Sequence, residues 1–392
     1  MTFPQLALSL VVILATAKVV GELCERLHQP AVLGELLVGV LIGPHVLGWV
    51  PNSEIIRLLA EIGAVLLLFE VGLESDLSEF IRVKTAALGV AVVGIVVPMS
   101  LGYALSMGLG LHGRGDVVPL FMAAVLAVTS TGITARVMKD LGRLNSSEAR
   151  VILGAAIVDD VLGLVLLATV VEIASSGRIS VSNAVLTALL AIVFLVGAVV
   201  IGILIAPQAL RIVRLMRTRG VLITWALVFC LFLAWSAEQV HLAAIVGAFA
   251  AGLVLAKTED RAHIEDRIRP LADIFVPIFF VWLGFAVQPR VFNPLAPEGW
   301  HALMITGALF VVAVVGKIVS GYAAVIPAIN RFAVGLGMVP RGEVGLIFAS
   351  LGLSIGIIDE ALYAVTAAVV LLTTVVVPPL LKTAMRSQPE QP

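Results

Sequence analysis

The chain has 392 residues, of which 60% are hydrophobic and only 13% are charged. Soluble globular domains carry about 25% charged residues, so this composition excludes a soluble protein and indicates a membrane protein. The net charge of −1 gives no electrostatic basis for nucleic-acid binding, and the sequence holds no phosphate-binding or dinucleotide-binding motif.

Apolar runs of membrane-spanning length follow one another along the chain. A helix needs about 20 apolar residues to cross the hydrocarbon core, and thirteen runs of this kind lie between polar breaks. They lie near residues 4–23, 30–50, 54–73, 85–108, 117–138, 149–173, 182–206, 220–237, 241–257, 270–288, 301–326, 332–353 and 360–381. The first run lacks a basic leading segment and is too long for a signal peptide. The sequence therefore predicts an all-α polytopic membrane protein with about 13 transmembrane helices and short loops.

Lysine and arginine residues are unevenly distributed between the two ends of these helices. If the N-terminus lies outside, eighteen of the 25 Lys and Arg residues fall in inner loops and three (Arg114, Arg178 and Arg290) in outer loops. Cytoplasmic loops carry the excess of positive charge in membrane proteins. We therefore expect an outer N-terminus and a cytoplasmic C-terminus.

Two of the runs are interrupted at mid-depth by polar residues and glycine. The fifth contains residues 129–132 (TSTG) and the twelfth contains residues 340–343 (PRGE). The two breaks are seven runs apart, so their helices run in opposite directions. Paired interrupted helices of opposite orientation are typical of inverted-repeat transporters, which bind their substrate at the breaks. Alternatively, the hydroxyls bond only to the preceding turn of their own helix, or residues 340–343 form a loop.

Asp159 and Asp160 lie side by side in the middle of the sixth run. A carboxylate at the bilayer centre costs roughly 2.5–3.5 kcal/mol, so this pair has no value as packing. It is tolerable if it faces a wet, protein-lined cavity and meets a cation. An ion or proton site is therefore our first hypothesis for this position.

Lys317, in the eleventh run, is the one lysine at comparable depth and the expected partner of this pair. Neighbouring helix residues point about 100° apart, so one aspartate can pair with Lys317 while the other faces an aqueous funnel. The alternative is that Lys317 extends to the membrane surface. The carboxylate that stays free can bind a cation or a proton in competition, and the hydroxyls of Thr129 and Ser130 can complete the oxygen ligands of Na⁺. The residues alone leave open whether Lys317 or Asp159 carries a second proton.

Three further charged residues lie near these positions. Arg341 and Glu343 flank Gly342 in the second break, where they are expected to neutralise the ends of half-helices. Glu70, near the end of the third run, is expected either to line the inner funnel or to lie at the membrane interface.

The chain resembles the CPA2 branch of the monovalent cation:proton antiporters, and in particular the NapA-type bacterial sodium/proton antiporters. The resemblance covers essentially the whole chain. The matching stretches are residues 29–36 (QPAVLGEL), 129–137 (TSTGITARV), 157–164 (IVDDVLGL), 316–317 (GK) and 340–347 (PRGEVGLI).

The resemblance implies a homodimer with a NapA/NhaA-like fold, in which two interrupted helices cross. A core bundle (about 85–173 and 301–381) would move like an elevator against a dimerisation bundle (about 4–73 and 220–288), with a linking helix at about 182–206. It implies that Asp160 is the main site for Na⁺ or H⁺ and that Asp159 pairs with Lys317. In this family, two adjacent aspartates go with electrogenic exchange, which implies two protons per cation. The resemblance also implies a bacterial inner membrane, a role in pH homeostasis and no cofactor.

Three alternatives stay open at this point. A K⁺/H⁺ or unselective exchanger would have the same motifs, although the nucleotide-binding domain of some K⁺-transporting relatives has no counterpart here. An intramembrane aspartyl protease needs two carboxylates that converge on one water, and adjacent residues diverge. A membrane scaffold would not need four charged groups at mid-depth, so we expect a transporter rather than an enzyme.

Overall fold

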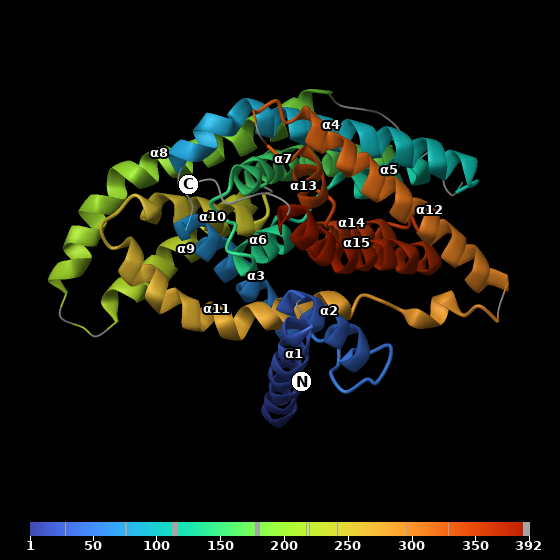
Figure 1. Cartoon of the computed structure of the whole chain (residues 1–392), viewed down its shortest axis with the longest axis horizontal. Coiled ribbons are helices and arrows are strands. Elements are labelled where there is room, and N and C mark those ends of the chain that lie inside the picture. The colour runs from blue at the N-terminus through green and yellow to red at the C-terminus, as the bar shows by residue number, and fades with distance from the viewer. Residues whose placement is uncertain are drawn as a thin grey trace.

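The computed structural model describes residues 1–27, 29–74, 77–111, 117–176, 181–216, 218, 220–240, 242–295, 297–327 and 329–386. Over these residues the regular structure is entirely helical (Figure 1). The α-helices are α1 (Phe3–Arg26), α2 (Ala31–Ile42), α3 (Glu54–Glu74), α4 (Leu77–Gly108), α5 (Val117–Ala127), α6 (Thr131–Asp140), α7 (Ser147–Ser176), α8 (Val181–Leu215), α9 (Val221–Gln239), α10 (Ala244–Ala256), α11 (Arg261–Gly284), α12 (Pro297–Ser320), α13 (Arg331–Gly337), α14 (Glu343–Ser354) and α15 (Glu360–Arg386). Two short 3₁₀ turns, η1 (Pro289–Phe292) and η2 (Gly321–Ala323), complete the set.

Each of the thirteen predicted runs contains helix, and the fifth and twelfth runs each form two helices in place of one. Seven helical segments of the described chain are long and apolar enough to span a membrane. Three more apolar helices, within α2, α10 and α14, are shorter. The all-α class is thus confirmed, whereas the number of thirteen crossings stays a prediction.

Two helix ends differ from the sequence prediction. Helix α2 ends at Ile42, well before the predicted residue 50, because Gly43 precedes Pro44 and a proline disfavours helical backbone in the residue before it. Helix α11 begins at Arg261, nine residues before the predicted start. Its charged first turns are helical because Ile264 and Ile268, one turn apart, are both buried.

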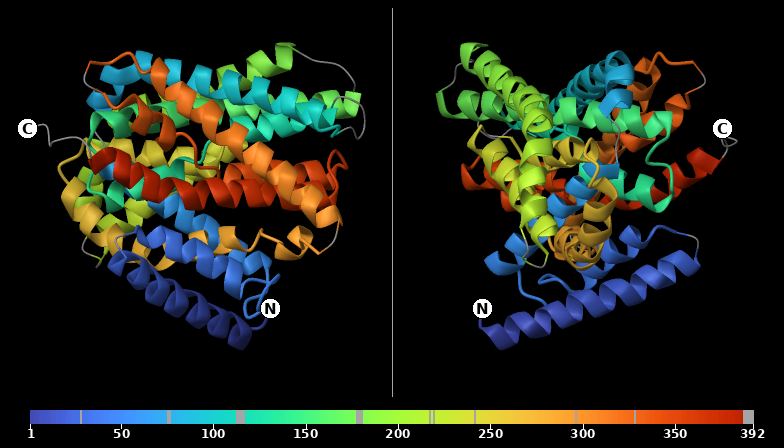
Figure 2. Two further views of the ribbon diagram at one scale, coloured as in Figure 1. Left: turned by 45° about the vertical axis from the view of Figure 1, so that its right-hand side comes forward. Right: turned by 90° about the vertical axis from the view of Figure 1, so that its left-hand side faces the viewer.

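The helices contact one another in two groups. Helix α3 packs on α10 and α11, and α2 packs on α1 and α11. In the other group α4 packs on α5, α7 and α12, and α15 packs on α12, α13 and α14. Helix α8 contacts α7 of one group and α9 and α10 of the other. Figure 2 shows α1 and α2 along one side of the molecule and α4 on the opposite side, with α12 running obliquely between them.

Within the first group, glycine allows the backbones of two helices to touch. A Cβ atom at Gly72 of α3 would lie 2.5 Å from the carbonyl oxygen of Phe249 on α10. Small residues at such crossings are typical of helix pairs in membranes, where close packing replaces the hydrophobic effect. This contact fixes α3 against α10 and leaves another face of α3 for α6 of the second group.

Candidate functional site

The two predicted breaks are present, and they contact each other. Helix α5 ends at Ala127 and α6 begins at Thr131, while α13 ends at Gly337 and α14 begins at Glu343. The backbone N–H of Ser130 donates a hydrogen bond to the carbonyl oxygen of Pro340 at 2.8 Å. Each break thus supplies hydrogen-bond partners for backbone that has left the other helix, as irregular backbone at membrane depth requires.

Side-chain hydroxyls make further bonds between the breaks. Thr129 Oγ1 donates to the carbonyl oxygen of Met338 at 3.1 Å, and Thr134 Oγ1 donates to that of Gly337 at 2.6 Å. A Cβ atom at Gly342 would lie 2.6 Å from Ser130 Oγ and 2.9 Å from Ile133 Cδ1, so a side chain at this position would require both neighbours to shift. The hydroxyls of Thr129 and Thr134 therefore join the two halves of the chain instead of bonding only within their own helix.

Arg341 is completely enclosed at this crossing, where it binds backbone carbonyls. Its guanidinium donates to the carbonyl oxygen of Val339 at 2.8 Å and to that of Leu126 in the last turn of α5. The last carbonyls of a helix lack partners within the helix and carry partial negative charge. The guanidinium thus neutralises the end of a half-helix, in line with the prediction for Arg341, although its partner Leu126 was not foreseen.

Asp159 and Lys317 form an ion pair with no exposed surface. The Nζ atom of Lys317, on α12, lies 3.1 Å from Oδ2 and 3.4 Å from Oδ1 of Asp159, on α7. Both side chains are 0% exposed, which excludes the alternative that Lys317 extends to the membrane surface. Mutual neutralisation lowers the cost of holding either charge away from water.

Asp160 points away from this pair toward the first break. Its Oδ2 atom accepts a hydrogen bond from Thr131 Oγ1 at 3.2 Å, and the residue is 6% exposed. Thr131 is the first residue of α6, so the carboxylate lies beside the positive end of a half-helix. The sequence predicts Thr129 and Ser130 as further oxygen ligands beside this carboxylate, and the structure adds Thr131. The signal was present in the sequence as the third hydroxyl of the TST run.

Glu70 does not join the aspartates. It is buried on α3, where its carboxylate lies 2.5 Å from Nζ of Lys139, on α6, and 3.8 Å from Nε of Arg269, on α11. Lys139 also lies 3.1 Å from Glu74. From its place at the end of an apolar run, Lys139 is expected to be one of the eighteen inner-loop charges, and the structure instead places it between two carboxylates of α3. Glu343 is the first residue of α14, and its side chain lies outside the described part of the structure.

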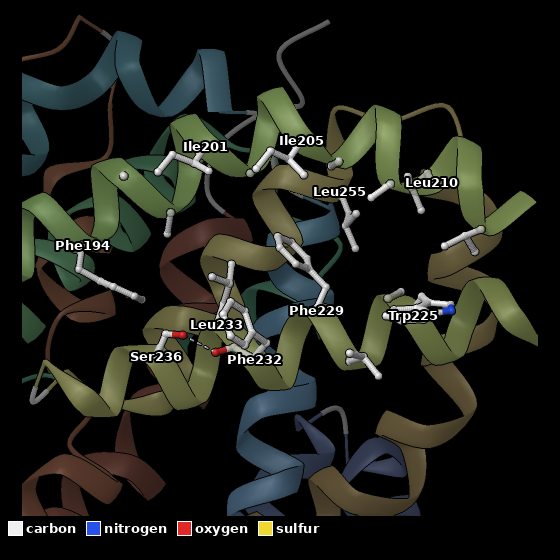
Figure 3. A pocket seen from close by; sticks show the side chains of 18 residues that line it. Phe194, Ile201, Ile205, Leu210, Trp225, Phe229, Phe232, Leu233, Ser236 and Leu255 are labelled. Carbon is white, nitrogen blue, oxygen red and sulfur yellow. Dashed lines mark hydrogen bonds between the residues drawn. The ribbon is translucent and has the colours of Figure 1, made fainter.

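A separate apolar groove of about 540 Å³ lies between α8 and α9 (Figure 3). Its walls include Phe194, Ile201, Phe229 and Leu233. Its one hydroxyl, that of Ser236, donates to the carbonyl oxygen of Phe232 at 2.7 Å. The residues that line this groove offer no charged group to a cation.

Comparisons with known proteins find a matching family model, similar sequences and a similar fold. A family model described as "sodium/hydrogen exchanger, transmembrane" matches residues 10–386. The high-affinity Na⁺/H⁺ antiporter NhaS3 of Synechocystis sp. is 42% identical, over 96% of this chain and 88% of that protein. The Na⁺/H⁺-K⁺ antiporter GerN of Bacillus cereus is 35% identical, over 97% and 95% of the two chains. The solved sodium proton antiporter MjNhaP1 of Methanocaldococcus jannaschii shares the fold, with a TM-score of 0.69 over 97% of each chain at 20% identity.

Proposed function

Since this chain belongs to the sodium/hydrogen exchanger family, we propose that it is an electrogenic secondary antiporter that exchanges Na⁺ for H⁺ across a bacterial inner membrane. The observation that carries this proposal is that the two adjacent aspartates have different partners. Asp159 is neutralised by Lys317, and Asp160 accepts a hydrogen bond from the hydroxyl of Thr131 at the start of a half-helix in the first break.

All thirteen helical runs cross the membrane in this proposal, with the N-terminus outside and the C-terminus in the cytoplasm. The excess of Lys and Arg in the inner loops supports this orientation. The two halves of the chain then form inverted repeats, and the interrupted helices α5–α6 and α13–α14 cross at mid-depth. The hydrogen bonds between Ser130 and Pro340 and between Thr129 and Met338 support this crossing.

The core bundle comprises α4–α7 and α12–α15, and the dimerisation bundle comprises α1–α3 and α9–α11, with α8 as the linking helix. The separation of the helix contacts into two groups supports this division. The core bundle moves past the dimerisation bundle and exposes Asp160 to one side of the membrane at a time, which is an elevator mechanism. Two copies associate through their dimerisation bundles.

Asp160 binds Na⁺ when ionised and releases it when protonated, so the two ions compete for one carboxylate. Na⁺ prefers oxygen ligands, which Asp160, Thr129 and Ser130 supply together with Thr131. Thr129 Oγ1 donates its hydrogen to the carbonyl oxygen of Met338, and the lone pairs of that hydroxyl stay available to a cation. Arg341 and Glu343 support the half-helix ends, and Glu70 serves the inner side of the pathway.

The pair of Asp159 and Lys317 supplies the second proton of the cycle. When Na⁺ occupies Asp160, its positive charge disfavours the nearby ammonium, and Lys317 releases a proton. When Na⁺ leaves, the lysine is protonated again and returns to Asp159. Two protons then move for each Na⁺, and the exchange carries net charge.

A second candidate is exchange of K⁺, or of several monovalent cations including Li⁺, for H⁺. Relatives favour keeping this candidate, because GerN is described as a Na⁺/H⁺-K⁺ antiporter. A K⁺/H⁺ antiporter subunit, KhtU of Bacillus subtilis, is 29% identical over 82% of this chain.

Proteoliposomes that contain a pH-sensitive dye and carry an imposed pH gradient test the proposal. Addition of Na⁺ is expected to dissipate the gradient through the parent protein but not through Asp160→Asn. Glu259→Gln is the control, since its exposed carboxylate pairs with Arg214 at the protein surface. A fully active Asp160→Asn protein would refute the assignment, and parallel titrations with Li⁺ and K⁺ decide between the two candidates.

A further inference from the structure

Four charged residues from three helices form a cluster that we name the inner clamp: Glu70 and Glu74 of α3, Lys139 of α6 and Arg269 of α11. Lys139 Nζ lies 2.5 Å from a carboxylate oxygen of Glu70 and 3.1 Å from one of Glu74. Arg269 Nε lies 3.8 Å from Glu70 on the other side. A single ammonium thus binds two carboxylates one helical turn apart.

The inner clamp connects the two bundles. Lys139 belongs to the proposed core bundle, whereas the three other members belong to the dimerisation bundle. Of the ion pairs found within the described residues, those of Lys139 with Glu70 and Glu74 are the ones that join α6 to α3. Any sliding of the core bundle past α3 must therefore separate these charges.

Burial makes this separation costly. The side chains of Glu70 and Lys139 are 4% and 18% exposed, so water screens them poorly compared with a surface pair. If one partner of such a pair leaves, the other is left as an uncompensated charge in a poorly hydrated place. The clamp therefore opens where Lys139 reaches water and Glu70 keeps Arg269 beside it.

The residues around the inner clamp allow Lys139 to move away from its carboxylate partners in one direction only. One turn away from Glu70, toward the outer side, α3 presents Leu67, which is fully buried. Gly132 of α6 faces this position, since a Cβ atom there would lie 3.7 Å from Leu67 Cδ2. An outward movement of α6 by one turn, about 5.4 Å, would bring the Lys139 ammonium level with apolar side chains. An inward movement carries it beyond the end of α3 at Glu74, toward the inner loops.

We propose that Lys139 is a gating residue. With Glu70 and Glu74 it closes the inner side of the ion pathway and fixes the outward limit of the movement of the core bundle. The proposal rests on the proposed function for the sliding of the bundles and for the orientation of the helices. The cation that is exchanged does not enter into it.

Labelling of a cysteine just outward of the clamp tests this proposal. Leu67→Cys, in a protein with Cys24→Ser and Cys230→Ala, places a thiol behind the closed clamp. A membrane-impermeant maleimide is applied to inside-out vesicles, and the labelling rate is measured. Lys139→Gln is expected to raise this rate on the order of tenfold, the population shift that about 1.4 kcal/mol produces. Lys139→Arg keeps the positive charge and is expected to keep labelling slow.

Arg214→Gln is the matched control. It removes an ion pair of comparable length, 2.8 Å to Asp260, on the exposed end of α8, and it is expected to label at the parent rate. Glu74→Gln provides a second variant if Lys139→Gln does not fold, and it is expected to label faster than the parent because one of the two carboxylates is lost. Equal labelling of the parent and both clamp variants overturns the proposal, as does a rise seen only from the outer side. If labelling depends on Lys139 while the parent exchanges no cation for protons, the clamp stands and the proposed function fails.

Discussion

The ammonium of Lys317, on α12, lies 3.1 Å from Oδ2 of Asp159, on α7, with neither side chain exposed. The two residues are 158 positions apart in the chain. Removing one member of such a buried pair is destabilising, because the other member is left as a charge without a partner in a place that water does not reach.

Removal of one member of this pair is expected to destabilise the protein. Asp159→Asn leaves the ammonium unpaired and should lower the free energy of unfolding by roughly 3–5 kcal/mol. Lys317→Met leaves the carboxylate unpaired in the same enclosed place, so a loss of comparable size is expected. The double variant removes both charges and should recover much of the loss of Asp159→Asn. Thermal unfolding in detergent measures the stability of all three variants. If the loss in the double variant equals the sum of the losses in the two single variants, the two residues are not coupled.

Asp159→Asn is also expected to remove net charge movement. Without the carboxylate, Lys317 has no partner to which it returns, and the second proton is lost from the cycle. Currents on a solid-supported membrane should fall to the level of empty liposomes, while exchange measured with a pH dye persists at a reduced rate. An undiminished current from Asp159→Asn would contradict a stoichiometry that depends on this pair.

Competition at Asp160 gives the affinity for Na⁺ a definite dependence on pH. A protonated carboxylate does not bind Na⁺, so the apparent KM for Na⁺ is expected to rise as the pH falls. By mass action the rise is about tenfold per pH unit where Na⁺ displaces only the proton of Asp160, and it approaches about a hundredfold per pH unit where Lys317 releases its proton as well. The maximum rate at saturating Na⁺ is unaffected by the competition. Na⁺ titrations of proteoliposomes at several pH values measure this. An apparent KM that is independent of pH would mean that Na⁺ and H⁺ occupy separate sites.

The contact between the breaks makes Gly342 sensitive to substitution. In Gly342→Ala the new methyl group would lie 2.6 Å from Ser130 Oγ, and overpacking of this kind costs about 1–3 kcal/mol. Transport is expected to be lost with it, because Ser130 precedes the helix end that faces Asp160. Gly307→Ala is the control, since a Cβ atom on this residue of α12 meets nothing within 4 Å. Equal transport by the two variants would show that the breaks are not in close contact.

Thr131 is expected to contribute to Na⁺ binding through its hydroxyl. Thr131→Val removes the hydrogen bond to Asp160 Oδ2 and one oxygen ligand with little change of shape. The apparent KM for Na⁺ should rise about tenfold, the factor that one hydrogen bond to a charged group of about 1.4 kcal/mol supplies. Thr306→Val is the matched control, because the hydroxyl of Thr306 is buried without a hydrogen-bond partner in the described part of the chain.

Much of the site was visible in the sequence because polar residues are conspicuous in apolar runs. The aspartate pair, Lys317 and both breaks could be found in this way, and the family resemblance drawn from the same motifs is confirmed by the match over residues 10–386. The pairing of Asp159 with Lys317, which the resemblance implied, is also the pairing that the structure has. The free-energy cost of placing an ionisable residue in lipid is high, so the presence of such a residue in an apolar run itself indicates a functional site.

The pairings across helices could not be predicted in the same way. Nothing in the spacing of the chain relates Arg341 to the carbonyl of Leu126, or Thr131 rather than Thr129 to Asp160, because these contacts depend on how two broken helices cross. Lys139 shows a second limit. A lysine at the end of an apolar run is usually a surface charge, and only the position of α3 reveals that two carboxylates hold it.

The distance along the chain between Asp159 and Lys317 has a consequence for biosynthesis. At 5–20 residues per second, the ribosome completes the lysine on the order of ten to thirty seconds after the aspartate. During this interval the first inserted half carries two carboxylates in lipid with no ammonium to meet them, and the backbone of its broken helix lacks Pro340 as an acceptor. The half-made protein must therefore keep these carboxylates protonated or shielded at the insertion machinery until the later helices arrive.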